Sequence, residues 1–349
     1  MQPTHDVVII GAGQAGLATA YYLQQMGVNP LLLEAASTIG EVWRGRYDSL
    51  RLFTPSQYLN LPGLAFPAPT DHYPTKDAVA DYLRAYAEKF DFNIMYDARV
   101  TRLTKTADHF EVTIGTETIA AKAVIVATGA LQSPKIPAFA SKLHASVNHL
   151  HSAHYRNPKM IPDGDILIVG GGNSGAQIGE ELALADRNVS VSIEKLPRHL
   201  PQRFLGKDIF WWLTKSGLVS TKPAKLVGST SSTTIPTIGV DLKNLSQRGK
   251  LNIVPRVIDA QGQHLMLADG STRAHANIIW ATGFVNDFSW IDIQGATEDQ
   301  NPIHTRGVSP VRGLYFIGLP FLHSKGSAFL GFVKDDAQYV ATMAATAFS

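Results

Sequence analysis

The chain has 349 residues, of which 45% are hydrophobic and 17% charged, a composition typical of a globular protein with a sizeable core, and its length favours two domains. A net charge of +2 without a long basic run gives no reason to expect nucleic acid or an anionic membrane as a partner. Because the chain contains no cysteine, a disulfide framework, a thiolate metal site and a redox-active cysteine pair are all excluded.

The first predicted elements lie between residues 5 and 34. The apolar run 7–10 has the length of a buried strand, and a glycine-rich turn follows at 11–16. A helical pattern then continues to Gly27, and the run 30–33 is a second strand that ends on Glu34. This order predicts a strand–helix–strand unit that binds a dinucleotide.

The glycine spacing explains the prediction physically. Gly11 permits the tight turn, Gly13 lets the backbone approach a pyrophosphate, and Gly16 lets the helix pack closely on the strand. The amides and the dipole at the helix start favour phosphate charge. Glu34, 23 positions after Gly11, is placed to accept hydrogen bonds from a ribose hydroxyl.

A proline-rich stretch and a meander follow. Five prolines between residues 55 and 74 exclude a helix or a central strand, and ordered loops of this length are usually functional. Thr75 is a predicted cap for a helix whose apolar face includes Val79 and Phe90. Between 93 and 127 the period changes to two, which predicts an antiparallel meander ending in a buried strand.

A second copy of the opening design lies at 165–194. It has a strand at 166–169, a glycine pattern at 170–175, a helix from 176 and a strand that ends on Glu194. Glu194 follows Gly170 by 24 positions, almost the spacing of the first copy. The chain is therefore predicted to bind two dinucleotides.

The remaining elements complete the predicted topology. We expect an aromatic-rich helix at 204–215, a Ser/Thr loop at 229–234, short strands and turns at 251–279 with a hairpin at Asp269-Gly270, a strand at 314–317 and a terminal helix at 334–347. The predicted fold is α/β with two Rossmann-like domains, each with a small antiparallel meander. Residues 162–283 are predicted to form one domain inserted into the other, which comprises 1–161 and 284–349.

The motifs together resemble those of class B flavin-containing monooxygenases, in the small soluble bacterial branch. The matching segments are GAGQAG at 11–16, IGEVWRGRYDSLRLFTP at 39–55, VIVATG at 124–129, VGGGNSG at 169–175, IWATGF at 279–284 and GLYFIGLPF at 313–321. The identifying motif of that family, F-x-G-x-x-x-H-x-x-x-(F/Y), is matched only by His151 and Tyr155, because Ala145 and Val147 replace the Phe and Gly. Tyr155 also argues against the Baeyer–Villiger signature.

The resemblance implies an FAD site in the first unit and an NAD(P)H site, for NADPH or NADH, in the second. The implied FAD contacts are Gly11, Gly13, Gln14, Ala15, Gly16, Glu34, Trp43, Arg44, Thr54, Val100, Ala127, Thr128, Gly129, Gly318 and Leu319. The implied NAD(P)H contacts are Gly170, Gly172, Asn173, Ser174, Gly175, Glu194, Lys195, Arg198, Ala281, Thr282 and Gly283.

The resemblance also implies a mechanism without a metal or a catalytic triad. The nicotinamide reduces the flavin, dioxygen forms a C4a-hydroperoxide, and a sulfide, an amine or some ketones take the distal oxygen, while the protein supplies placement and water exclusion. Phe53 and Thr54 are expected beside the flavin, and plain core packing is left open as the alternative for Phe53. Phe53 stands where larger family members have asparagine, which suggests that the hydroperoxide is less well protected here.

Coenzyme choice is expected to depend on Glu194. Larger family members tend to have a cation at this position, which suits a 2′-phosphate, whereas an acid suits a free 2′-hydroxyl. Lys195 and Arg198 follow closely and offset the acid. We therefore predict that NADH is accepted along with NADPH, with weak discrimination.

Two other functions stay open from the sequence. One is a ferredoxin or quinone reductase that does not oxygenate, and the other is a redox-sensing flavoprotein without catalytic activity.

The expected partners are a small-molecule substrate and O2, with no nucleic acid and no membrane, and a homodimer is left open. No stretch reaches the roughly 18 apolar residues of a membrane span, and no signal peptide is apparent, so we expect a cytoplasmic protein. Four aromatic residues are candidates for an apolar entrance or for core: Phe210, Trp211, Trp212 and Phe329.

Overall fold

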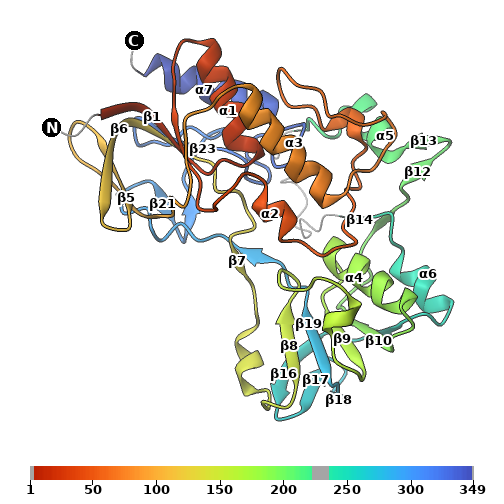
Figure 1. The fold of residues 1–349 in the computed structure, drawn as a ribbon. Coiled ribbons are helices and arrows are strands. Elements are labelled where there is room, and N and C mark those ends of the chain that lie inside the picture. The colour runs from red at the N-terminus through yellow and green to blue at the C-terminus, as the bar shows by residue number, and fades with distance from the viewer. Residues whose placement is uncertain (1–3, 222–235, 348–349) are drawn as a thin grey trace.

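The computed structural model describes residues 4–221 and 236–347, so the predicted Ser/Thr loop at 229–234 lies outside the described residues. Two sheets with parallel strands dominate, each with helices packed on it (Figure 1). Within the described ranges no helix is long and apolar enough to cross a membrane. The predicted class, two Rossmann-like α/β units with meanders, is confirmed.

The first sheet has the strand order β3-β2-β1-β6-β5-β4, and β23 pairs with β6. Its strands are β1 Thr4–Ile10, β2 Leu31–Leu33, β3 Ile94–Met95, β4 Val100–Lys105, β5 Phe110–Ile114, β6 Glu117–Val126 and β23 Leu314–Phe316. The start of β6 pairs antiparallel with β5, which forms the predicted meander, while its end pairs parallel with β1 and β23.

The alternation of side chains along these strands divides the core into two faces. Ile9 and Ile125 face a cluster that includes Leu17 of α1 (Gln14–Gln25) and residues of α3 (Lys76–Lys89) and α7 (Lys334–Thr346). Ile10 and Val126 face the other cluster, with Phe288. The predicted cap of α3 is confirmed, since the Ala78 amide donates to Thr75 Oγ1 at 3.2 Å.

The second sheet has the order β15-β10-β9-β19-β8, and all four pairings are parallel. Its strands are β8 Asn148–His151, β9 Ile166–Val169, β10 Val189–Ser192, β15 Asn252–Val254 and β19 Asn277–Trp280. The helices α4 Asn173–Leu184 and α6 Leu242–Gln247 belong to this unit. Its meander consists of β16 Val257–Gln261, β17 His264–Leu267 and β18 Thr272–Ala274, with the predicted hairpin at Asp269-Gly270.

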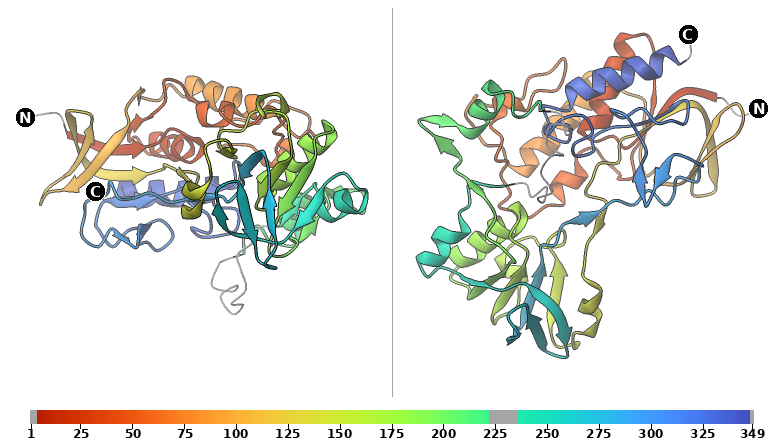
Figure 2. Two further views of the ribbon diagram at one scale, coloured as in Figure 1. Left: turned by 90° about the horizontal axis from the view of Figure 1, so that it is seen from below. Right: turned by 180° about the vertical axis from the view of Figure 1, so that it is seen from behind.

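Two chain crossings link the units. β7 Ser133–Pro134 pairs antiparallel with β20 Phe284–Val285, and this short ribbon lies between the two sheets (Figures 1 and 2). The domain division predicted at residue 161 stays a prediction, but β8 lies in the second sheet although that division assigns it to the first domain. The polar sequence of β8, NHLH, carries no signal of the sheet to which it belongs.

The segment after β10 differs from the prediction. The helix predicted from Phe204 begins only at Ile209, as α5 Ile209–Lys215, and a hairpin of β12 Arg203–Phe204 and β13 Lys207–Asp208 precedes it. Leu205 and Gly206 have positive φ values of 47° and 74°, which a right-handed helix does not allow. The remaining short elements are α2 Glu41–Arg44, η1 Ser56–Tyr58, η2 Ala138–Lys142, η3 Pro158–Met160, β11 His199–Leu200, β14 Thr237–Ile238, β21 Thr297–Glu298 and β22 Asn301–Pro302.

Candidate functional site

The carboxyl edge of the first sheet gathers residues from distant parts of the chain. Ile10 pairs with Leu33 and with Val126, and Val126 pairs with Phe316, so the residues that follow these strands emerge side by side. They include Gly11, Glu34, the Ala-Thr-Gly turn at 127–129 and Gly318. The order places β1 between β2, reached through α1, and β6, which is the switch point where open α/β sheets bind their ligands.

The three glycines of the first turn have different physical reasons to be glycine. A Cβ on Gly11, whose φ is +103°, would lie 2.7 Å from the Ala127 carbonyl oxygen. A Cβ on Gly16 would lie 2.0 Å from the carbonyl oxygen of Gly11. A Cβ on Gly13 would meet nothing within 4 Å, so the protein itself does not require a glycine there. The open space at Gly13 fits a pyrophosphate that approaches the backbone at the start of α1.

The second unit repeats this arrangement. A Cβ on Gly170 would lie 2.4 Å from the Ala281 carbonyl oxygen, and a Cβ on Gly175 would lie 2.0 Å from the Gly170 carbonyl oxygen. Gly172 again has nothing within 4 Å. At the three positions of the G-x-G-x-x-G pattern, both turns therefore have two glycines required by packing and one that faces open space.

The two terminal acids have different surroundings. The carboxylate of Glu34 accepts the Ala12 amide at 2.9 Å and the Ala36 amide at 3.0 Å, so it fixes the glycine turn and keeps lone pairs for a ribose hydroxyl. Glu194 instead accepts from Arg256 Nη1 at 3.2 Å and is largely exposed, as are Lys195 and Arg198. Arg256, which lies 62 residues after Glu194, was not identified from the sequence as a partner of this acid.

The two Ala-Thr-Gly turns are held by side chains at the crossings between units. Gln132 Nε2 donates to Thr128 Oγ1 at 2.9 Å and to the Gly129 carbonyl at 2.7 Å. In the second turn Thr282 donates to the Lys135 carbonyl, and the Gly283 carbonyl accepts from His151 at 2.9 Å. Both turns thus lie where a strand ends and the chain enters the ribbon of β7 and β20.

His151, one of the two motif residues, is fully buried at the end of β8. Its Nδ1 accepts the Ala153 amide at 3.1 Å, so Nε2 carries the proton and donates to the Gly283 carbonyl. Burial lowers the pKa of His151, and the bond to Gly283 opposes this shift only in part. The other motif residue, Tyr155, donates to Glu181 of α4 at 2.8 Å. Both residues therefore hold the β8 segment to the second unit.

The pKa of His151 predicts a pH dependence of stability. Since its folded pKa lies below the ordinary value of about 6.5, the unfolded chain binds the proton more readily, and stability falls as pH decreases through that window. We expect the unfolding free energy to fall between about pH 7 and pH 5, by at most about 1.4 kcal/mol per pH unit for each such group. His275 and His304, whose pKa values burial also lowers, add to this slope. Urea unfolding at several pH values should show a shallower slope for His151→Gln. His264→Gln, at an exposed position of β17, controls for the loss of a histidine, and equal slopes for wild type and His151→Gln would contradict the expectation.

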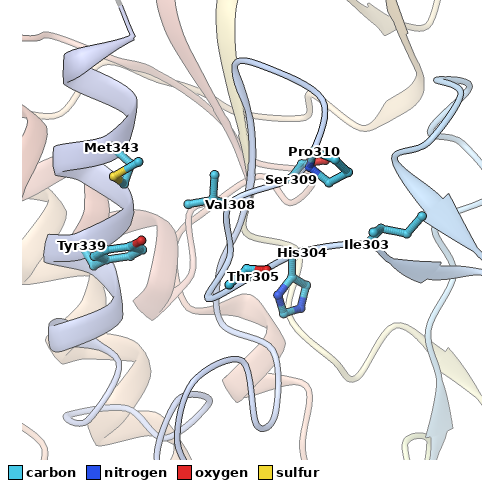
Figure 3. A pocket seen from close by; sticks show the side chains of 8 residues that line it. All are labelled: Ile303, His304, Thr305, Val308, Ser309, Pro310, Tyr339 and Met343. Carbon is cyan, nitrogen blue, oxygen red and sulfur yellow. The ribbon is translucent and has the colours of Figure 1, made fainter.

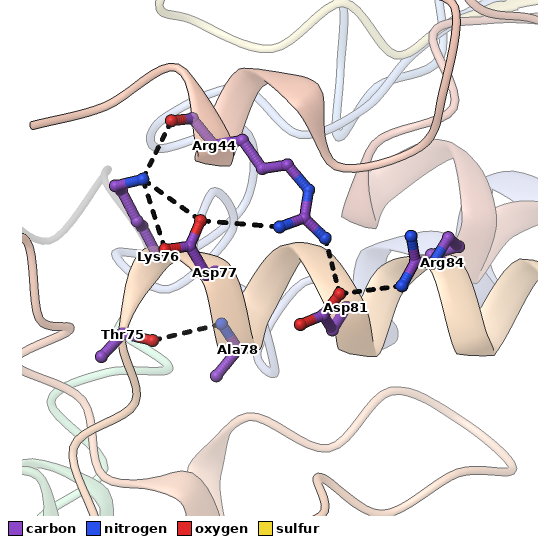
Figure 4. A network of polar contacts seen from close by, with 7 residues as sticks. All are labelled: Arg44, Thr75, Lys76, Asp77, Ala78, Asp81 and Arg84. Carbon is purple, nitrogen blue, oxygen red and sulfur yellow. Dashed lines mark hydrogen bonds and ion pairs between the residues drawn. The ribbon is translucent and has the colours of Figure 1, made fainter. Parts of the chain in front are cut away.

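Trp43 and Arg44 lie on the short helix α2, which packs against α3. Arg44 Nη2 lies 2.5 Å from Asp81 Oδ1, and Nη1 lies 3.6 Å from Asp77 (Figure 4). Lys76 Nζ donates to the Arg44 carbonyl at 3.0 Å and to Asp77 at 3.1 Å. The charge of Arg44 is therefore already compensated by α3, while Trp43 packs on the core cluster that includes α1. Their contact with FAD stays a prediction.

Phe53 lies in an aromatic cluster where three segments meet. Its ring stacks on Phe210 of α5 with centroids 5.9 Å apart, and meets Phe329 edge-on at 6.3 Å. Tyr58 and Phe332 complete the cluster, and Thr54 is buried beside it. Of the four aromatic residues considered for an entrance, Phe210 is core. Trp211 and Trp212 are half-buried and pack edge-to-face at 4.8 Å.

A buried carboxylate fixes this cluster. Asp208 Oδ2 accepts from Tyr73 at 2.6 Å and from Gln202 Nε2 at 2.8 Å, and Oδ1 caps α5 by accepting the Phe210 amide at 2.7 Å. Gln202 Nε2 also donates to the Phe53 carbonyl at 2.8 Å. Burial and the bond to Asp208 raise the pKa of Tyr73 to about 12, so it remains a donor at neutral pH. Asp208, Gln202 and Tyr73 thereby join the proline-rich loop to the segment before α5.

Several of the remaining predicted residues lie close to the starts of α1 and α4. Gly318, with a φ of +76°, would place a Cβ 2.8 Å from Ala15 Cβ, and Gln14 Nε2 donates to the Ala328 carbonyl at 3.3 Å. Leu319 is buried, and Val100 begins β4. At the second helix, Asn173 donates to the Pro236 carbonyl at 3.3 Å and accepts the Ile238 amide at 3.0 Å, with Ser174 next to it. The first turn of α4 is thus tied to β14.

Two cavities lie away from the glycine turns. One of about 460 Å³ lies between α7 and a loop of the first unit (Figure 3), and its lining residues are Ile303, His304, Thr305, Val308, Ser309, Pro310, Tyr339 and Met343. The other, of about 320 Å³, lies where the chain leaves β2 and β3 and includes Ser37, Thr38 and Tyr96. No predicted site residue lines either one, so the candidate site is defined by the two strand edges. Among the described residues no group of His, Asp and Glu is arranged to hold a metal ion.

Comparison with known proteins gives a consistent family. Residues 8–203 match the model described as pyridine nucleotide-disulphide oxidoreductase. An uncharacterized CzcO-like oxidoreductase of Geobacillus kaustophilus is 44% identical over 342 residues, which cover 97% of this chain and 98% of that protein. The structure of a flavin-containing monooxygenase from Stenotrophomonas maltophilia superposes with a TM-score of 0.83 at 25% identity, over 100% of both chains. A bacillithiol disulfide reductase of Staphylococcus aureus has the same fold, with a TM-score of 0.70 at 16% identity over 99% of both chains.

Proposed function

The chain belongs to the pyridine nucleotide-disulphide oxidoreductase family, as a flavin monooxygenase-like oxidoreductase, and from this premise we propose that it is an FAD-dependent monooxygenase that uses NAD(P)H and O2. FAD would bind at the edge formed by Gly11, Glu34, Ala127 and Gly318, and the nicotinamide nucleotide at the edge that begins with Gly170. The observation that carries this proposal is the pair of glycine turns, each with one glycine that faces open space. No protein atom requires a glycine at Gly13 or Gly172, because a Cβ would meet nothing there. A bound phosphate group would account for the glycine at each position.

The proposed substrates are soft nucleophiles, namely sulfides and amines, with some ketones as a further class. NAD(P)H, a proton and O2 are consumed, one oxygen atom forms a bond to the substrate's sulfur or nitrogen, and the other leaves as water with NAD(P)+. The bound flavin supplies the redox and oxygen chemistry. The chain's own residues bind and orient the two nucleotides and exclude water.

The protein's part in this proposal is positional. Glu34 would hold the ribose of FAD, while its bonds to the Ala12 and Ala36 amides fix the glycine turn. His151 and Gln132 fix the two Ala-Thr-Gly turns, so both nucleotides would meet a rigid backbone at the crossing between units. Phe53 and Thr54 would lie beside the flavin, where the aromatic cluster around Phe53 would keep water away.

A reductase that passes electrons onward without oxygenation is the alternative. The fold is shared with a bacillithiol disulfide reductase, which favours this class only at the level of architecture. Since the chain has no cysteine, any such reduction would proceed without a redox-active cysteine pair, and a quinone or a ferredoxin would be the acceptor in this alternative.

A coupled assay separates the two functions. With FAD-loaded protein, we expect thioether sulfides to increase NADPH and NADH consumption and to yield one sulfoxide per coenzyme oxidised. Amines and ketones complete the panel, and a quinone is the control acceptor. Coenzyme oxidation that rises with the quinone but yields no oxygenated product from any member of the panel would contradict the monooxygenase proposal.

A further inference from the structure

Two opposite charges emerge in register at the carboxyl edge of the second sheet. β10 and β15 are parallel neighbours, and Ser192 pairs with Val254, so Glu194 and Arg256 each lie two residues beyond a paired position. Arg256 Nη1 reaches Glu194 Oε2 at 3.2 Å. The ion pair therefore joins the acid that follows β10, the second strand of the nucleotide unit, to a cation that follows the neighbouring strand β15.

The position of Arg256 is fixed by a buried hydroxyl. Ser192 Oγ donates to the Pro255 carbonyl at 3.0 Å and accepts the Val257 amide at 2.9 Å. These two bonds hold the residues on both sides of Arg256 against the end of β10. The backbone of Arg256 is thus held on both sides, while its side chain is largely exposed.

The ion pair is easily opened. The side chains of Arg256 and Glu194 are 62% and 66% exposed, and surface pairs of this kind contribute about 0–1 kcal/mol to stability. A stronger partner would therefore separate them at little cost. A 2′-phosphate is such a partner for arginine, whose planar fork binds phosphate in bidentate fashion, whereas a free ribose hydroxyl is a partner for the glutamate.

We propose that the Arg256–Glu194 pair sets the coenzyme selectivity of this protein, with Arg256 binding the 2′-phosphate of NADPH and Glu194 the ribose hydroxyl of NADH. This inference rests on the proposed function, which assigns the nicotinamide nucleotide to the second unit. Without a ligand each side chain neutralises the other, so Glu194 repels a phosphate less than an unpaired acid would. Lys195 and Arg198 are exposed and form no ion pair within the described residues, so they add to the positive potential at this edge.

Arg256 is better placed to bind a phosphate than Lys195 and Arg198, the two cations that follow Glu194 in the sequence. The guanidinium of Arg256 already lies 3.2 Å from the Glu194 carboxylate, which marks the expected position of the ribose. Arg198 is used through its backbone, which accepts the Thr237 amide at 2.9 Å, and its side chain is exposed. Lys195 presents a single ammonium group rather than a fork.

The test measures binding of two nucleotide fragments to the FAD-loaded protein by calorimetry. 2′,5′-ADP carries the phosphate in question, and 5′-AMP lacks it. We expect Arg256→Gln to weaken 2′,5′-ADP binding by about 10- to 100-fold, the value of a charge-assisted hydrogen bond, and to change 5′-AMP binding less than about twofold. Arg256→Lys, which keeps the charge but not the fork, should lie between Arg256→Gln and wild type. Glu194→Gln should strengthen 2′,5′-ADP binding and weaken 5′-AMP binding.

The chain offers a matched control in Arg248, which is exposed and follows α6. Because α6 leads into β15, Arg248 lies at the opposite edge of the sheet, and Arg248→Gln removes the same charge without touching the pair. We expect it to leave both affinities unchanged. Equal loss of 2′,5′-ADP binding in Arg248→Gln and Arg256→Gln, or no loss in Arg256→Gln, would overturn the inference alone. If wild type bound neither fragment, the assignment of the second unit in the proposed function would fail as well.

Discussion

Replacing Gly16 with alanine is expected to lower the melting temperature by about 10 °C or more, a loss of roughly 4 kcal/mol. The added methyl group would lie 2.0 Å from the Gly11 carbonyl oxygen and 3.3 Å from Ile9, and the first contact is with backbone that cannot rotate away. Relief requires α1 to move off β1, which would disturb the cluster shared with α7. Circular dichroism during heating measures the loss.

Gly13→Ala is the matched control for that variant. It makes the same chemical change three residues earlier, at a φ of −77° that alanine accepts and in a space with no atom within 4 Å. We expect its apoprotein to melt within about 2 °C of wild type, while its affinity for FAD falls by about 100-fold because the methyl group occupies the pyrophosphate position. Flavin retained after gel filtration reports the affinity. A Gly13→Ala protein that keeps FAD as tightly as wild type would contradict the assignment of the first turn.

Much of the fold could be predicted because its signals are local. The glycine turns, the cap at Thr75 and the terminal helix depend on residues close together in the chain, and the structure confirms these elements. The late start of α5 was missed because an aromatic run suggests a helix. A helix cannot begin at Phe204, because Leu205 and Gly206 form the left-handed turn of the hairpin between β12 and β13.

The features that could not be predicted depend on strand order. Arg256 approaches Glu194 only because β15 lies beside β10, and β8 joins the second sheet only because it pairs with β19. One signal for Arg256 was present. A short strand at 252–254, with Ile253 and Val254, follows α6, and the third strand of a doubly wound unit commonly lies next to the second. A cation two residues after such a strand is then a candidate neighbour for the acid.

The hydrogen bonds of Asp208 show a second kind of limit. Tyr73, Gln202 and Phe53 meet because the proline-rich loop and the hairpin before α5 touch, and neither has a periodic pattern. Sequence reasoning placed Phe53 either in the core or beside the flavin. The structure shows it half-buried and stacked on Phe210 at the junction of the two segments, so packing against the aromatic cluster is established and contact with the flavin stays a proposal.

Gly172→Ala is expected to separate the roles of the two units. Gly172 has a φ of −69°, and a Cβ added there would meet nothing within 4 Å, so alanine fits the apoprotein and FAD at the first unit is unaffected. The methyl group would occupy the space for the pyrophosphate of the nicotinamide nucleotide. We expect kcat/KM for flavin reduction by NADPH or NADH to fall by about 100-fold, equivalent to about 2.7 kcal/mol.

The measurement follows the visible absorbance of the bound flavin without oxygen. Dithionite, which needs no nucleotide site, is the control reductant and should reduce Gly172→Ala as completely as wild type. Gly13→Ala reconstituted with excess FAD should show the opposite defect, with weak flavin retention but normal reduction of the flavin that is bound. If Gly172→Ala instead lost FAD and kept its reduction rate, the two nucleotides would have exchanged sites. That result would place the flavin at the edge of the second sheet, where Glu194 pairs with Arg256 rather than with the backbone of its own turn.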